Sequence, residues 1–114
     1  MDAHLKPVGE LLDTVPHQPK IKRSAYEVSG RYPIVDQSQS DTAGYTSDDA
    51  WLYHGELPVV VFGDHTRVLK FVDFPFCVGA DGTQLLRPVA GIELRYFYYA
   101  LRNIDLKNYG LFGF

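Results

Sequence analysis

Short apolar runs, separated by glycine, proline and polar turn residues, fill the middle of the chain. They are RYPIVDQ, PVVVF, RVLKFV, DFPFCVG and TQLLRPV, at residues 31–37, 58–62, 67–72, 73–79 and 83–89. Valine and aromatic residues dominate these runs, which is typical of strands, and the consecutive valines at 59–61 indicate a buried one. Because no segment of helical length separates the runs, we expect the strands to pair antiparallel in a curved sheet.

One segment near the end of the chain follows the helical period instead. In GIELRYFYYALRNIDL, residues 91–106, four apolar residues fall at i, i+3, i+4 and i+7, and these are Leu94, Phe97, Tyr98 and Leu101. Glu93 lies near the start and Arg102 near the end, where the helix dipole favours an acid and a base respectively. The pattern predicts an amphipathic helix that packs on the sheet.

The N-terminal part of the chain predicts only short elements. Residues 7–15, PVGELLDTV, fit either a short helix or an extended lead-in. In SAYEVSG, residues 24–30, Ser24 and Glu27 have the spacing of a capping box and predict one helical turn. Residues 43–49, AGYTSDD, lead into a polar loop. The expected fold is α+β: a mostly antiparallel, curved β-sheet with a C-terminal amphipathic helix and short N-terminal helical turns.

The composition narrows the class of protein. The 114 residues suffice for one compact core, and a content of 46% hydrophobic residues excludes a disordered chain. No run approaches the roughly 18 apolar residues of a membrane span, and the first residues lack the pattern of a signal peptide. The lone Cys77 can form no internal disulfide, and we expect it to be buried and unreactive. These features predict a single domain over residues 1–114 that works in the cytoplasm, away from membranes.

Charge is distributed unevenly along the chain. The net charge is −3, which argues against a uniformly basic nucleic-acid binder. Residues 20–31, KIKRSAYEVSGR, nevertheless hold four basic side chains against the single acid Glu27, and these are Lys20, Lys22, Arg23 and Arg31. The sequence therefore allows a locally basic face on an acidic domain.

The sequence contains none of the common catalytic motifs: no zinc-ligand spacing, no GxxxxGK phosphate loop and no GxSxG nucleophile elbow. Asp64, His65 and Asp81 could meet as a metal or acid–base site. Adjacent residues on a strand point to opposite faces, however, so we do not expect Asp64 and His65 to contact each other. Asp64 and Asp81 equally suit turns in which the side chain bonds the loop backbone. Lys70 is expected to be a solvated strand residue.

A polar loop follows the first predicted strand. Its glutamines, Gln37 and Gln39, are candidate base contacts, because an amide side chain offers both a donor and an acceptor and can pair bidentately with adenine. The same residues equally suit an ordinary loop. Composition alone does not decide between these interpretations.

Three blocks of the sequence, in this order, resemble the target recognition domain of a type I restriction-modification specificity subunit. They are SGRYPIVDQSQSDTAGYTSD, LPVVVFGDHTRVLKFVDFPFCVGADGTQLLRP and LRYFYYALRNIDLKNYG. The resemblance spans roughly residues 20–110, with residues 1–19 as a lead-in. The central block is long and unusual, which makes it the most specific part of the match.

The resemblance implies a DNA-reading module that performs no chemistry. In that family, two such domains each read half of a split site and are separated by long helices. This chain has one domain and no long heptad helix, as expected of an excised domain, a truncated product or a half-subunit fragment. The implied partners are double-stranded DNA and the methyltransferase and restriction subunits. S-adenosylmethionine, ATP and magnesium belong to those subunits, so the resemblance implies no cofactor and no metal in this chain.

The resemblance also suggests roles for individual residues. Gly63 and Gly82 would permit tight turns, and side chains of the GDHTR segment would face outward as donors toward DNA, while basic side chains would bind phosphates. The candidate DNA contacts are Lys20, Lys22, Arg23, Arg31, Gln37, Gln39, His65, Thr66 and Arg67. Alternatively, GDHT braces the fold, and the loops at residues 37–41 and 47–54 carry the specificity.

Two other functions stay open at this point. The chain could be a protein-interaction or regulatory module that binds a restriction subunit without touching DNA, and an exposed apolar patch would favour this. It could also be a small hydrolase or nuclease that uses Asp64, His65 and Asp81. A melting temperature that does not respond to metal, together with no cleavage of DNA, would eliminate the second.

Overall fold

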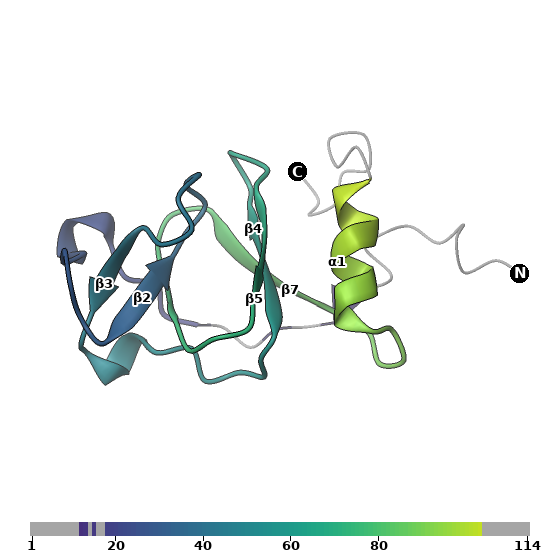
Figure 1. Ribbon diagram of the computed structural model, residues 1–114, viewed down its shortest axis with the longest axis horizontal. Helices are drawn as coiled ribbons and strands as arrows, with labels where there is room; N and C mark the ends of the chain where they lie inside the picture. Colours follow the sequence, from purple (N-terminus) through teal and green to yellow (C-terminus); the bar gives the residue numbers. More distant parts are fainter. Residues whose placement is uncertain (1–11, 14, 16–17, 104–114) are drawn as a thin grey trace, which may run out of the picture.

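The computed structural model describes residues 12, 13, 15 and 18–103, which fold into three layers (Figure 1). A four-stranded sheet forms the middle layer. A three-stranded sheet packs against one of its faces, and a helix packs against the other. The predicted α+β class, with mostly antiparallel strands and a late helix, is confirmed, and the strands divide between two open sheets.

The middle sheet has the strand order β1-β7-β4-β5, and each neighbouring pair is antiparallel. Its strands are β1 (Leu12–Asp13), β4 (Val59–Gly63), β5 (Leu69–Val72) and β7 (Thr83–Pro88). The apolar runs in the sequence predicted the last three. Of the two interpretations of residues 7–15, the extended one holds at Leu12–Asp13, because these residues pair with Pro88 and Arg87 at the edge of the sheet.

All five residues of β4 are buried, as its run of valines predicted. Alternate side chains of the strand face the two outer layers. Val60 and Phe62 pack with the helix, whereas Val59 and Val61 pack toward the second sheet. A fully buried side chain of this size contributes about 1.5–3 kcal/mol through removal of apolar surface from water. β4 is therefore the strand on which both halves of the core depend.

The second sheet has the order β3-β2-β6, from β2 (Tyr32–Val35), β3 (Gly44–Thr46) and β6 (Cys77–Val78). Strand β3 falls in the segment that was expected to lead into a loop. β6 runs parallel to β2, with Ile34 opposite Cys77, and this pair is the parallel exception in a fold predicted to be mostly antiparallel. The two strands are far apart in sequence, and the long connection between them permits the parallel arrangement.

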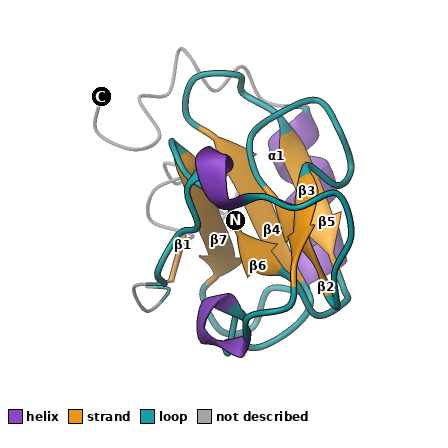
Figure 2. Cartoon of the chain, turned by 90° about the vertical axis from the view of Figure 1, so that its left-hand side faces the viewer, coloured by secondary structure: helices purple, strands orange, loops and turns teal. Residues whose placement is uncertain are grey.

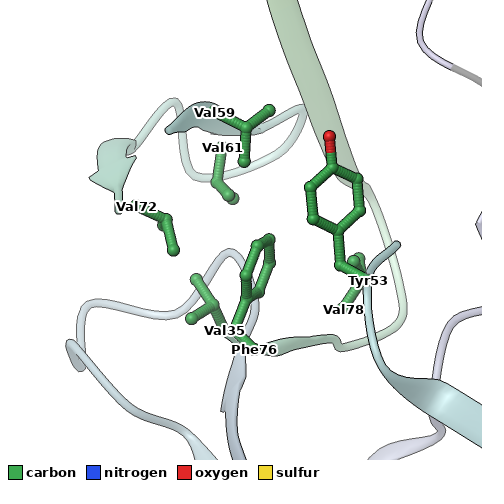
Figure 3. Close-up of a cluster of buried hydrophobic side chains, with 7 residues drawn as sticks. All are labelled: Val35, Tyr53, Val59, Val61, Val72, Phe76 and Val78. Atoms are coloured by element: carbon green, nitrogen blue, oxygen red, sulfur yellow. The ribbon is translucent and has the colours of Figure 1, made fainter. Parts of the chain in front are cut away.

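A cluster of buried side chains joins the two sheets (Figure 3). Valines from both sheets meet around the ring of Phe76, and Tyr53 lies beside that ring with centroids 5.3 Å apart. The cluster consists of Val35, Tyr53, Val59, Val61, Val72, Phe76 and Val78. The Tyr53 hydroxyl donates to the Glu56 carbonyl at 3.1 Å and accepts from the Arg87 guanidinium at 3.1 Å, so its polar end is satisfied.

Helix α1 (Leu94–Arg102) lies behind the strands in Figure 2 and covers the outer face of the middle sheet. Its predicted apolar stripe is confirmed, because Phe97 and Leu101 are buried and the other two stripe residues pack beside them. Glu93 caps the first turn, where its carboxylate accepts the backbone N–H groups of Arg95 at 3.0 Å and Tyr96 at 2.8 Å. These hydrogen bonds lower the pKa of Glu93.

The predicted capping box is wrong. A 3-10 turn, η3, covers Arg23–Ala25, so Ser24 lies inside the turn instead of capping it. Glu27 pairs through its backbone with Tyr45, next to the second sheet. The local pattern alone placed Glu27 in a helical turn, whereas its backbone makes this strand-like pairing instead. A second 3-10 turn, η4 (Asp49–Trp51), is capped by the Asp48 carboxylate.

Most of the predicted lead-in over residues 1–19, namely residues 1–11, 14, 16 and 17, lies outside the described residues, as does the predicted end of the helix at residues 104–106. In the part of the chain that the structure describes, no helix has the length and apolar character needed to cross a membrane.

Candidate functional site

Three polar loops meet at one end of the two sheets. They are the loop after β2 (residues 36–40), the β4–β5 turn (residues 64–67) and the β6–β7 turn (residues 79–82), and we call them the loop cluster. The first two lie at the top of the molecule in Figure 1. Between the loop cluster and η3 lies an open hollow of 560 Å³. Its lining includes Lys22, Arg23, Asp36, Gln37, Thr66 and Asp81.

Gln37 connects all three loops of the cluster. Its side-chain Nε2 donates to the Asp81 carbonyl at 2.7 Å, and its Oε1 accepts the backbone N–H groups of His65 at 3.0 Å and Thr66 at 3.2 Å. The Thr66 hydroxyl in turn donates to the Gln37 carbonyl at 2.6 Å. Thr66 and the backbone of His65 therefore brace the loops, which is the alternative role considered for the GDHT segment.

Gly63 and Gly82 allow these loops to come close together. Gly82 has a φ of +72°, and a Cβ at this position would meet Gln37 Nε2 and Asp64 Oδ1. A Cβ on Gly63 would meet the Thr66 hydroxyl and the Gln37 Cβ. The prediction that glycine serves a tight turn is confirmed for Gly82, whereas Gly63 ends β4 without a positive φ and its reason is the close approach of the loops.

Asp36 is buried at the base of the loop cluster. Its carboxylate accepts the Tyr26 hydroxyl at 2.9 Å and the Ser38 backbone N–H at 2.8 Å. Burial opposes ionisation, yet these hydrogen bonds and the nearby Lys70 charge lower the pKa of Asp36. Burial and the Asp36 carboxylate raise the pKa of Tyr26. Asp36 is therefore an anion held by hydrogen bonds, and it fixes the start of the loop.

Lys70 is not the solvated strand residue that the sequence predicted. Its ammonium group donates to the carbonyl oxygens of Asp36 and Ser40, each at 2.7 Å. Burial lowers the pKa of Lys70, although the charges of Asp36 and Asp41 oppose this. The signal in the sequence was the alternation of β5: Lys70 shares a face with the buried Val72 and so points toward the second sheet.

Asp64 and His65 come closer than the strand argument allowed, because they lie in a turn. His65 Nε2 is 3.4 Å from Asp64 Oδ1, and the imidazole is 80% exposed, so His65 faces outward as predicted. Asp64 Oδ1 is buried, and within the described residues it accepts no hydrogen bond of good geometry. Asp64 therefore orients the imidazole loosely, and the imidazole reaches solvent.

Arg67 occupies the end of the same turn in a left-handed conformation, with φ of +63°. Its backbone N–H donates to the Gly63 carbonyl at 2.8 Å, which closes the turn. The guanidinium lies over the Phe62 ring, 5.7 Å from its centroid. Gln39, by contrast, is exposed, and within the described residues its side chain makes no hydrogen bond.

The structure separates the four basic residues of the segment at 20–31. Lys22 and Arg23 are exposed and line the hollow beside the loop cluster. Lys20 is half-buried and lines a different hollow, of 290 Å³, with Thr83 and Gln84. Arg31 lies beside η4, with its guanidinium 3.6 Å from the Asp49 carboxylate. The four residues do not form one basic face around the loop cluster.

Asp64, His65 and Asp81 do not form a metal site. Among residues 12, 13, 15 and 18–103, no group of three histidine, cysteine or acidic side chains is arranged to hold a metal ion. Cys77 is fully buried, and burial raises the pKa of its thiol to about 11. Cys77 therefore carries little thiolate at neutral pH, as the sequence predicted.

No protein-family model and no solved structure matches the chain. One curated protein does match: the specificity subunit of the type I restriction enzymes EcoR124I and EcoR124II from Escherichia coli, which is 27% identical over 104 residues. The similarity suggests a type I restriction specificity subunit. The alignment covers 86% of this chain and 25% of the relative, so the chain spans about a quarter of the length of the curated protein it matches.

Proposed function

We propose that this chain is a non-catalytic module that reads the sequence of double-stranded DNA in a type I restriction-modification system. The observation that carries the proposal is the similarity to a type I specificity subunit over 86% of the chain. The loop cluster supports it, because it presents polar side chains from three separate loops on one surface. Base edges are read by such donors and acceptors, whereas basic residues on phosphates set the register.

The base contacts that we propose are polar side chains of the loop cluster. The exposed Gln39 has an amide donor and an acceptor available, and the exposed His65 imidazole projects from the β4–β5 turn. Arg67, at the end of that turn, is the third proposed contact. These residues belong to loops that are fixed on strands, which keeps their geometry defined before DNA binds.

Lys22 and Arg23 are the phosphate contacts that we propose. Both are exposed at the wall of the hollow beside the loop cluster, so the sugar–phosphate backbone of a DNA strand that crosses the hollow would pass them. Each phosphate contact contributes about 0.9 to the dependence of log K on log salt for duplex DNA. Lys20 and Arg31 lie elsewhere and are secondary candidates.

The proposed function also assigns partners. A methyltransferase subunit and a restriction subunit would perform the chemistry, with S-adenosylmethionine, ATP and magnesium bound to them, and the assembly would work in the cytoplasm. This chain would supply only the choice of DNA site.

Selection from a random duplex library, followed by titration of the selected duplex at several salt concentrations, tests the proposal. We expect a defined sequence to be enriched, and we expect K22A/R23A to reduce the salt slope by about 2, since two phosphate contacts are lost. R102A is the matched control: Arg102 is an exposed arginine on α1, on the far side of the middle sheet. Failure to bind duplex DNA at low salt, even with a methyltransferase subunit present, would contradict the proposal.

A protein-interaction module is the second candidate function, and one observation favours it. Tyr96 is 70% exposed and Tyr99 is 50% exposed, one turn apart on the outer face of α1. Exposed aromatic residues of this kind are enriched at protein interfaces. If Y96S/Y99S abolishes binding to a restriction or methyltransferase subunit, and the wild-type chain selects no DNA, this second function replaces the first.

A further inference from the structure

The amide group of Gln37 is committed to hydrogen bonds inside the protein. A glutamine amide has two donor hydrogens and two acceptor lone pairs. Oε1 accepts from the His65 and Thr66 backbone N–H groups, which uses both lone pairs, and Nε2 donates to the Asp81 carbonyl. Bidentate pairing with adenine needs a free donor and a free acceptor on one amide. Gln37 has no free acceptor, so it cannot make this contact while the loops keep this arrangement.

The backbone of Gln37 strengthens the same connection. Its carbonyl accepts the Thr66 hydroxyl at 2.6 Å, so Thr66 is bound to Gln37 through both its hydroxyl and its N–H. Gly63 and Gly82 approach Gln37 so closely that a Cβ on either would meet it, so the connection needs glycine at both positions. Gln37 is therefore the side chain that bonds the loop after β2 to both turns, and these two turns are also joined to each other by the Asp64 N–H, which donates to the Gly82 carbonyl at 2.9 Å.

We propose that Gln37 is a positioning residue: it holds the β4–β5 turn and the β6–β7 turn at the end of β2, so that His65 and Gln39 are presented to DNA. The inference rests on the proposed function. The effect of Gln37 on His65 is direct, because the His65 backbone N–H donates to Gln37 while the His65 imidazole stays 80% exposed. Gln39 lies two residues further along the same loop, exposed and with its amide available.

The physical benefit of such a residue is preorganisation. Loops that are already ordered lose less conformational entropy on binding, and they present their donors at fixed distances from one another. The loss of Gln37 should therefore weaken discrimination at every base pair that the loop cluster reads. The loss of a direct base contact should weaken discrimination at one base pair.

The first experiment measures backbone amide exchange in the free chain, by nuclear magnetic resonance. Q37M removes every side-chain hydrogen bond at similar length, Q37E keeps an acceptor for His65 and Thr66, and Q39M is the matched control in the same loop. We expect exchange at His65 and Thr66 to accelerate about tenfold in Q37M, because these amides lose their acceptor. In Q39M we expect exchange at both amides to stay within about twofold of wild type, and in Q37E we expect a smaller acceleration than in Q37M, because its carboxylate keeps the acceptor but sets a second oxygen against the Asp81 carbonyl. Unchanged exchange in Q37M would overturn the inference.

The second experiment repeats the duplex selection with the same variants. We expect Q37M to flatten preferences at several base pairs, Q39M to relax one base pair, and Q37E to retain more of the wild-type preference than Q37M. A Q37M variant that relaxes a single base pair would show Gln37 to be a base contact, and the inference would be wrong. If the wild-type chain selects no sequence, the proposed function fails, and the role of Gln37 toward DNA fails with it. Amide exchange would still show separately whether Gln37 connects the loops.

Discussion

The ammonium group of Lys70 lies 2.7 Å from the backbone carbonyl oxygen of Asp36, which binds strand β5 to the loop that follows β2. A second carbonyl in that loop, from Ser40, accepts from the same ammonium at 2.7 Å. The loop thus has a charged anchor at its base, and Gln37 connects it to the other two loops. Both residues act on the backbone, so the shape of the loop cluster depends little on the identity of its exposed side chains.

Replacement of Lys70 by methionine should destabilise the protein. The substitution keeps the aliphatic stem but leaves the Asp36 and Ser40 carbonyls without their donor, and we expect the free energy of unfolding to fall by about 1–2 kcal/mol. K22M is the control, because Lys22 is exposed, and it should change stability by less than about 0.5 kcal/mol. Urea denaturation measures both. Equal effects of the two substitutions would contradict the role of Lys70.

Asp36 should make stability depend on acid. Its pKa is lowered in the folded state, so its contribution is present above its ordinary pKa of 3.8 and is lost as pH falls through the lower folded value. The wild-type chain should therefore lose stability over this acidic range, and D36N should lose less. At neutral pH, D36N should be the less stable protein, because its neutral amide is a weaker partner for Tyr26 and Ser38. Melting temperatures of the two proteins at pH values from neutral to below 3.8 check this, and parallel curves would refute it.

Gly82 and Gly91 allow backbone strain to be separated from crowding. Both have positive φ, at +72° and +96°, but a Cβ on Gly82 would meet Gln37 and Asp64, whereas a Cβ on Gly91 would meet nothing within 4 Å. We expect G91A to cost about 1 kcal/mol through backbone strain alone, and G82A to cost about 3 kcal/mol. Chemical denaturation compares them. If G82A proves no more costly than G91A, the loops are less tightly packed than described.

Asp81 should weaken DNA binding if the proposed function is right. Its carboxylate lies at the wall of the hollow that holds Lys22 and Arg23, and an anion there repels phosphates. D81N should increase affinity for duplex DNA by about two- to fivefold at low salt, and the gain should vanish at high salt. The Gln37 amide binds the Asp81 backbone, so this substitution leaves that hydrogen bond intact. D73N, at an exposed position outside the hollow, should leave the affinity unchanged. Fluorescence anisotropy titrations measure the affinity of both variants for duplex DNA.

The sequence predicted those elements that have strong local patterns. β4 has a run of valines, and α1 has a clear helical period with Glu93 at its start, so both were found. β3 was missed because it has only three residues, too few for a recognisable alternation. The parallel pairing of β2 with β6 was missed because the paired residues, such as Ile34 and Cys77, are distant in sequence.

The candidate site was predicted in part. The role of Gly82 followed from backbone chemistry that is local to its turn, whereas the crowding at Gly63 comes partly from Gln37 and had no local signal. The partners of Gln37, by contrast, are 28 to 44 residues away in the chain, and no local pattern indicates that its amide is occupied. The partial burial of Lys70 could have been inferred, because alternate residues of a strand share a face and Lys70 shares one with the buried Val72.

The burial of β4 on both faces has a consequence for how this protein can fail. The loop cluster takes its strands from both sheets, and those sheets are held together by the side chains that meet around Phe76. Damage to that contact would therefore separate the three loops of the loop cluster from one another even if every loop kept its own sequence. A chain with a weakened interior should therefore lose the arrangement of all three loops in one cooperative step.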